Sequence, residues 1–164
     1  MLAAFAAWWG RLKDALPRAI AAALAATIAY AASRWLLGHP QPVFTAVGAI
    51  VCLAPGIPSH VRQSVNVLLG VTLGILIGEA VLFVPGPIWE FRVGLAVFLS
   101  LAIGASFGLP PVFAIQAGVS ATLIQLMGPE TAGLNRLLDV AVGLAVSLPF
   151  GAALYLTRSR DDAA

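Results

Sequence analysis

Four polar side chains lie within or beside otherwise apolar segments of this 164-residue chain: Glu79, Asp139, Arg34 and Gln116. An ionisable side chain inside a membrane span is costly unless it is paired, neutral or in contact with water, and it is therefore a functional candidate by default. A carboxylate in such a place can load and release a proton, and a guanidinium can hold a carboxylate through two parallel hydrogen bonds. We therefore take these four residues as candidates for a substrate or proton pathway.

Each candidate also has a simpler interpretation. Glu79 lies four residues, about 6 Å, from the end of its apolar segment, so it could be a solvated glutamate at the membrane surface. Asp139 follows Arg136 at a spacing that permits an ordinary ion pair at the start of a helix. Arg34 either extends to the interface or clamps an anionic substrate. Gln116 either lines a pathway or makes one hydrogen bond between helices.

The composition places the chain in a membrane, because 60% of its residues are hydrophobic and only 10% are charged. Its length gives room for one domain of about six spans of roughly 20 residues each. The net charge of +2 without a basic run excludes nucleic acid as a partner. No nucleophile and base pair, metal-binding cluster or phosphate loop is recognisable, so we expect no enzyme activity, no cofactor and no metal. The single cysteine, Cys52, is expected to be a small core residue.

Hydropathy and Gly/Pro-rich turns divide the chain into six apolar segments: residues 17–37, 43–53, 64–83, 91–107, 112–127 and 137–156. The second segment is too short to cross about 30 Å of hydrocarbon as one clean helix, and the fifth is marginal.

The amino end resembles a retained interfacial helix rather than a signal peptide, because its basic residues follow the apolar stretch. Trp8 and Trp9 are then expected at the depth of the lipid headgroups. Pro17 would fall in the first turn of the first span, where its missing N–H costs nothing. The expected organisation is an interfacial segment at 1–16, a transmembrane domain at 17–157 and a cytoplasmic tail at 158–164.

The distribution of lysine and arginine sets the expected orientation. Six of these residues fall on the side of the two termini: Arg11, Lys13, Arg18, Arg62, Arg158 and Arg160. Three fall on the opposite side: Arg34, Arg92 and Arg136. Because cytoplasmic loops carry the excess of positive charge, we expect both termini in the cytoplasm.

Small residues recur at every fourth position in two of the segments. Gly70, Gly74 and Gly78 form such a strip in the third segment, although each glycine costs about 1 kcal/mol of helix propensity relative to alanine. Residues four apart share one helix face, so the strip allows another backbone to approach closely. The sixth segment carries a matching strip, which we expect to be the packing partner: Gly143, Ser147 and Gly151.

The two halves of the chain resemble each other. The sequence PVF opens the second segment at Pro42 and the fifth at Pro111, while Asn66 and Asp139 precede the two small-residue strips at equal spacing. A repeat unit of three spans must enter the membrane from opposite sides in its two copies. The sequence therefore predicts an all-α membrane protein with six transmembrane helices arranged as two inverted three-helix repeats. Chance similarity between apolar segments is the alternative.

Three stretches resemble the fusaric acid resistance-like family of aromatic acid exporters: LLGHPQPVFTAVGAIVCLAPG (36–56), RQSVNVLLGVTLGILIGE (62–79) and NRLLDVAVGLAV (135–146). The resemblance covers nearly the whole chain. It implies efflux of aromatic carboxylic acids or similar amphiphiles across a bacterial inner membrane, driven by the proton-motive force. Larger members of the family have two six-span halves, so a homo-oligomer, most simply a dimer, is expected here. The alternative is a structural or regulatory membrane subunit without transport activity of its own.

Overall fold

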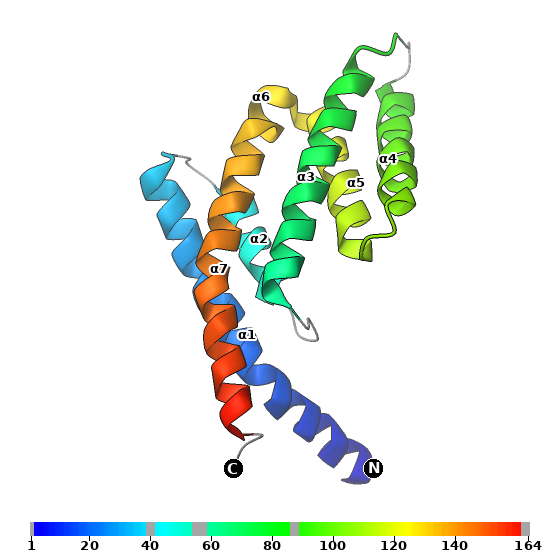
Figure 1. The fold of residues 1–164 in the computed structure, drawn as a ribbon. Coiled ribbons are helices and arrows are strands. Elements are labelled where there is room, and N and C mark those ends of the chain that lie inside the picture. Colours follow the sequence, from blue (N-terminus) through cyan, green and yellow to red (C-terminus); the bar gives the residue numbers. More distant parts are fainter. Residues whose placement is uncertain (1, 39–41, 54–58, 86–88, 162–164) are drawn as a thin grey trace. The chain divides into compact units, whose positions relative to one another are not determined.

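The described residues of the chain form helices and no strand. The computed structural model describes residues 2–38, 42–53, 59–85 and 89–161 (Figure 1). Its seven helices in these ranges are α1 (Leu2–Leu36), α2 (Val43–Leu53), α3 (His60–Leu82), α4 (Trp89–Ser106), α5 (Pro111–Met127), α6 (Pro129–Ala132) and α7 (Leu134–Asp161).

Within the described residues, four stretches of helix are long and apolar enough to cross a membrane: Ala7–Leu36, Val61–Leu82, Trp89–Ser106 and Pro129–Leu154. The helices α2 and α5 are also apolar but have only 11 and 17 residues. At 1.5 Å per residue α2 reaches about 16 Å, roughly half of the hydrocarbon thickness. The prediction of an all-helical membrane protein is confirmed, with four helices rather than six that meet the length of a full span.

Helix α1 continues through Pro17, which the sequence analysis expected at the start of a span. A proline inside a helix lacks one N–H donor and crowds the carbonyl group of the preceding turn. The alanine- and leucine-rich residues on both sides have high helix propensity, and Pro17 is exposed, so the helix tolerates this defect. Figure 1 shows α1 bending between its dark blue amino-terminal part and the lighter blue part that follows.

The chain divides into two compact units. Unit 1 consists of Met1–His60 together with Val142–Ala164, and unit 2 of Val61–Ala141. Helix α7 belongs to both, because residues 134–141 pack in unit 2 and the rest of the helix packs in unit 1.

The core of unit 1 is built from small residues of α1 and α2 and larger residues of α7. Ala25 and Ala29 on α1 meet Ala49 and Leu53 on α2, and the partly buried side chains that complete this cluster include Val146, Phe150 and Leu154. Alanines at these positions let the helix axes approach closely, which matters in lipid because no hydrophobic drive brings helices together there.

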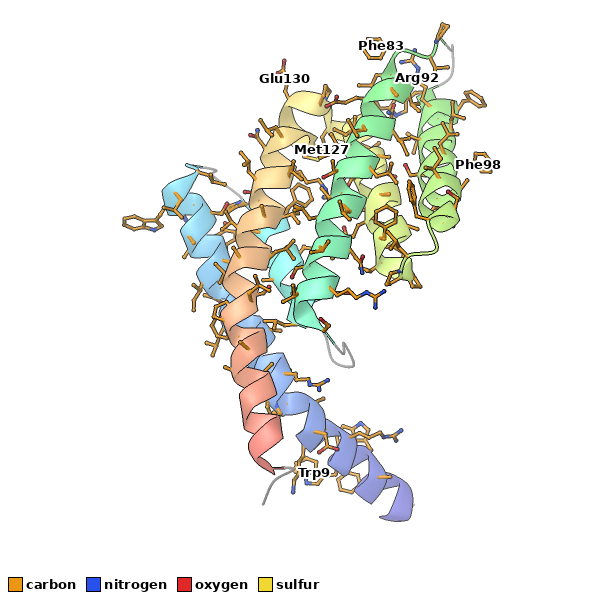
Figure 2. The ribbon with its side chains drawn as sticks, in the orientation of Figure 1. Trp9, Phe83, Arg92, Phe98, Met127 and Glu130 are labelled. Carbon is orange, nitrogen blue, oxygen red and sulfur yellow. The ribbon has the colours of Figure 1, made fainter. Side chains whose placement is uncertain are left out.

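The core of unit 2 brings together α3, α4 and α5. Ile77 and Val81 on α3 pack with Ala96 on α4 and Ala121 on α5. The opposite face of α4 carries Phe98, which is exposed and points away from the helix (Figure 2). Such large exposed side chains suit a surface that lipid covers.

The turn after α5 contains the short helix α6, which the sequence analysis treated as a loop. Gly128 ends α5 with a φ of +81°, a conformation that glycine adopts at little cost, and its N–H donates to the carbonyl oxygen of Ile124 at 3.0 Å. The N–H groups of Ala132 and Gly133 then donate to the carbonyl oxygens of Gly128 and Pro129. One helical turn therefore separates α5 from α7.

Candidate functional site

The three glycines of α3 lie against the backbone of α5. The atoms nearest to Gly70 and Gly74 are the carbonyl oxygens of Phe113 and Ala117, and a Cβ atom added at Gly78 would lie 2.8 Å from the Cβ of Ile124. Even a methyl group at these positions would collide with α5. We call this contact the α3–α5 seam, defined by Gly70, Gly74 and Gly78 and the α5 residues that face them.

The expected pairing of the two small-residue strips is wrong. On α7 the nearest atoms to Gly143 belong to Thr45 of α2, within unit 1, and Ser147 and Gly151 are buried. The glycines of the strip on α3 therefore pack on the short helix α5, and Gly143 packs on the short helix α2. The spacing of glycines specifies a flat helix face, and it does not specify which backbone that face meets.

Helix α5 contributes three buried polar side chains near this seam: Gln116, Ser120 and Gln125. The Cβ atoms of Gln116 and Ser120 lie 3.1 Å and 2.7 Å from the positions where Gly70 and Gly74 would carry theirs. Ser120 Oγ donates to the carbonyl oxygen of Gln116 at 2.7 Å. Polar groups so placed in an apolar bundle must find partners within the protein, because lipid supplies none.

Gln125 crosses the seam. Its Nε2 donates to the carbonyl oxygen of Gly78 on α3 at 2.6 Å, and the side chain is 1% exposed. Its Oε1 is buried and accepts no hydrogen bond from any residue that the structure describes. This oxygen is therefore available to accept a hydrogen bond from an N–H or O–H group outside these residues.

Arg136 at the start of α7 turns its side chain into unit 2, where it is 2% exposed. Its Nε donates to Ser120 Oγ at 3.1 Å. Ser120 faces Gly74, which lies eight residues, about 12 Å, before the end of α3 at Leu82. The guanidinium group therefore lies well inside the helical bundle, whereas the sequence analysis counted Arg136 among the residues beyond the end of a span.

Asp139 is also buried, at 4% exposure, one helical turn after Arg136. Arg136, Asp139, Gly143 and Ser147 follow one another at intervals of three or four residues, so they share one face of α7. Arg136 thus shares a helix face with the small-residue strip. This shared face is the signal in the sequence that could have shown that Arg136 is buried, because the strip itself is a packing surface. We call Gln116, Ser120, Gln125, Arg136 and Asp139 the polar core of unit 2.

Glu79 lies at the rim of this polar core. It is half-buried, and its Oε1 lies 3.4 Å from the position of a Cβ atom at Gly133. No hydrogen bond or ion pair joins Glu79 to another residue in the part of the chain that the structure describes. The preceding residue, Gly78, has the carbonyl oxygen to which Gln125 donates. Glu79 therefore directly follows this contact between α3 and α5.

Arg34 belongs to unit 1. It is exposed in the last turn of α1 and, with Tyr30, Ala31 and Trp35, lines an open depression of about 610 Å³. Of the four residues that the sequence singled out, the structure thus places Glu79, Gln116 and Asp139 in unit 2.

No group of three or more potential metal ligands occurs among the residues described. The described polar side chains of unit 2 supply hydrogen bonds and charge. A guanidinium, two amides, a hydroxyl and two carboxylates are enough to bind a small polar ligand and to exchange protons with it.

Comparison with known proteins gives curated relatives. A protein of Mycobacterium tuberculosis strain H37Rv and one of Mycobacterium bovis, each named "Putative arylamide transporter", are 30% identical over 153 residues, which covers 88% of this chain. An uncharacterized protein of Corynebacterium glutamicum is 24% identical over 141 residues, or 84% of this chain. The chain spans 42% of the mycobacterial relatives' length and 36% of the corynebacterial one. No solved structure gives a significant match.

A family model extends this similarity over most of the helical bundle. The model of fusaric acid resistance protein-like sequences matches residues 24–150, from the middle of α1 to the second half of α7. That range contains the strip on α3, Gly143 and Ser147 of the strip on α7, and the whole polar core of unit 2, and the chain belongs to the fusaric acid resistance protein-like family.

Proposed function

We propose that this protein is a transporter that exports small aromatic carboxylic acids or similar amphiphilic compounds across the bacterial inner membrane. The observation that carries the proposal is the polar core of unit 2, in which a buried guanidinium is bonded to Ser120 among apolar helices. A buried charge destabilises a membrane bundle unless it is compensated, and close packing alone does not require one. Family membership and the transporter name of the mycobacterial relatives support the same conclusion.

We propose that the proton-motive force drives export and that Glu79 carries the proton. The carboxylate is half-buried and has no partner among the described residues, so its protonation state can change without breaking an internal ion pair. It directly follows Gly78, whose carbonyl oxygen accepts the bond from Gln125 of the polar core of unit 2.

The proposed architecture is a pair of inverted three-helix repeats, α1 to α3 and then α4, α5 and α7, with both termini in the cytoplasm. The contacts within each unit support it. In unit 2 Gly70 meets Phe113, the last residue of the second PVF sequence, and in unit 1 Gly143 meets Thr45, the residue after the first PVF sequence. Each strip thus packs near the start of the short helix of the other repeat.

The amino-terminal segment is proposed to lie in the membrane interface. Phe5, Trp8 and Trp9 cluster with ring centroids 5.8–6.4 Å apart, and all three are about half exposed or more. Lys13 lies over the Trp9 ring at 5.7 Å, in the part of α1 where Figure 2 labels Trp9. Aromatic rings beside a cation suit the headgroup layer of a bilayer.

The test is export from cells. Cells with and without the protein are loaded with labelled benzoate, and the label retained is followed with and without an uncoupler. Faster loss that requires both the protein and the proton-motive force is expected. Equal retention in the two strains would overturn the transport proposal and favour a structural or regulatory membrane subunit.

A further inference from the structure

We propose that Arg136 is the residue that binds the carboxylate group of the substrate, with Ser120 as the residue that positions it. This inference rests on the proposed transport function, since it names the group in the polar core of unit 2 that recognises the transported anion. The ligand class is a small organic acid in its anionic form, held between α5 and α7.

The first support is the depth of the charge. Arg136 is 2% exposed, and its Nε reaches Ser120 at the level of Gly74, about 12 Å before the end of α3. Long basic side chains near helix ends normally extend outward to water. Arg136 lies near the start of α7 and turns inward instead, which places a cation where an anion entering the bundle would meet it.

The second support is the orientation of the guanidinium group. Ser120 Oγ accepts from Arg136 Nε and donates its own proton to the carbonyl oxygen of Gln116, so the hydroxyl is held in one direction. The bond at Nε restrains the guanidinium group. The end of the group opposite Nε has the spacing of donors that matches the two oxygens of a carboxylate.

The third support is a difference between the two repeats. Arg62 precedes the strip on α3 much as Arg136 precedes the strip on α7, yet Arg62 is exposed and Arg136 is buried. A buried arginine required by the fold itself would be expected in both copies. Its burial in one copy alone makes Arg136 a candidate for a role toward a ligand, because an ionisable side chain inside a membrane bundle is a functional candidate.

The test is equilibrium binding to the purified full chain in nanodiscs of phosphatidylcholine at neutral pH. Labelled benzoate is the probe, and unlabelled benzoate, benzamide and chloride are the competitors. Benzoate is expected to displace the label, whereas benzamide, which has the same ring without the charge, and chloride, which has charge without the planar carboxylate, are expected to compete at least tenfold less well.

The variants separate binding from packing. Arg136→Gln is expected to weaken benzoate binding about 10- to 100-fold, the range for losing hydrogen bonds to a charged group. Arg136→Lys keeps the positive charge but loses the paired N–H donors of the guanidinium group, so it should bind benzoate with intermediate affinity. Ser120→Ala should weaken binding several-fold. Ser100→Ala is the matched control, because Ser100 is equally buried in unit 2 but lies on α4 and bonds to no described residue.

Four results would overturn the inference: unchanged affinity of Arg136→Gln, equal competition by benzamide, equal competition by chloride, or no binding of benzoate to the unaltered protein. If Arg136→Gln fails to fold, the comparison of Ser120→Ala with Ser100→Ala decides, and equal affinities would reject the proposal. Charge-selective binding without export would reject the proposed function alone. Export that is unchanged in Arg136→Gln would reject this inference alone.

Discussion

Gly74 of α3 lies against the carbonyl oxygen of Ala117 on α5, so that any side chain at Gly74 would meet the backbone of α5. The contact fixes how closely the two helices approach. It also fixes the position of Ser120, one turn further along α5, whose Cβ is the next nearest atom to Gly74. The polar core of unit 2 therefore depends on a residue that has no side chain.

The seam is tested by adding side chains to it. Gly74→Ala is expected to lower the stability of the protein in detergent by about 1–3 kcal/mol, the usual cost of overpacking, and Gly74→Leu to abolish assembly. Gly94→Ala is the control, because Gly94 on α4 has no atom within 4 Å of its added Cβ and alanine favours the helix there. Thermal unfolding followed by size-exclusion chromatography measures both. Similar melting temperatures for Gly74→Ala and Gly94→Ala would show that the seam is loose.

Gln125 is tested with two variants, one that removes both polar groups of the amide and one that removes only the donor. Gln125→Met removes the bond to Gly78 and also the Oε1 that has no described partner, so the stability should change by less than about 1 kcal/mol. Gln125→Glu keeps acceptors and loses the donor, so it should be the more destabilising change at neutral pH. Thermal unfolding in the same detergent gives the order. If Gln125→Met lowered the stability by clearly more than about 1 kcal/mol, the bond to Gly78 would be worth more than the cost of the unmatched oxygen.

Glu79 is tested with a variant that cannot ionise. Glu79→Gln is expected to fold and assemble normally and to export benzoate without dependence on the pH gradient. Glu130→Gln serves as the control, because Glu130 is an exposed carboxylate on α6 (Figure 2). Export is measured in cells at two external pH values. Should Glu79→Gln keep the pH dependence of the unaltered protein, Glu79 would be an interfacial residue and Asp139 the next candidate.

Arg34 is expected to anchor α1 at the membrane surface. Arg34→Gln should change the rate of benzoate export less than twofold, because the side chain is exposed at the end of α1 beside Tyr30 and Trp35. The rate of benzoate export by Arg136→Gln in the same assay is the reference for a large loss of export. A loss of export in Arg34→Gln as large as that in Arg136→Gln would restore the alternative in which Arg34 clamps the substrate.

The proposed assembly is a homo-oligomer, most simply a dimer, in which a second copy supplies a second six-helix half. Native mass spectrometry from nanodiscs and from two mild detergents measures the stoichiometry directly. A monomer under all three conditions would contradict this proposal.

The sequence predicted the helices well because their signals are local. Hydropathy and the Gly/Pro-rich turns located α2 at the bounds that the structure gives and α5 to within one residue at its start. The starts of α3 and α7 were misplaced by four and three residues and the end of α7 by five, because polar residues such as Arg62 and Asn135 extend the helices beyond their apolar cores. Helix α6 was missed because a single turn carries no periodic pattern.

The candidate site was predicted only in part, since its key relationships join distant residues. Gln116 and Asp139 were singled out because each is polar within an apolar run. Arg136 was counted with the residues outside the spans, and only the contact with Ser120 shows that the side chain turns inward. Ser120 was not singled out, because a serine in an apolar run is also common where helices pack closely.

The discontinuity of unit 1 determines the order in which the molecule can be completed during synthesis. Unit 2 is one continuous stretch of chain, so all of its helices are available as soon as residue 141 has been made. Helix α2 completes its packing later, because the residue that faces its Thr45 is Gly143, which is synthesised after unit 2. Until then this 11-residue helix, too short to span the bilayer, can pack on α1 through Ala25, Ala29 and Ala49. The small alanine contacts between α1 and α2 are therefore available to α2 before the residues of α7 that complete unit 1 are made.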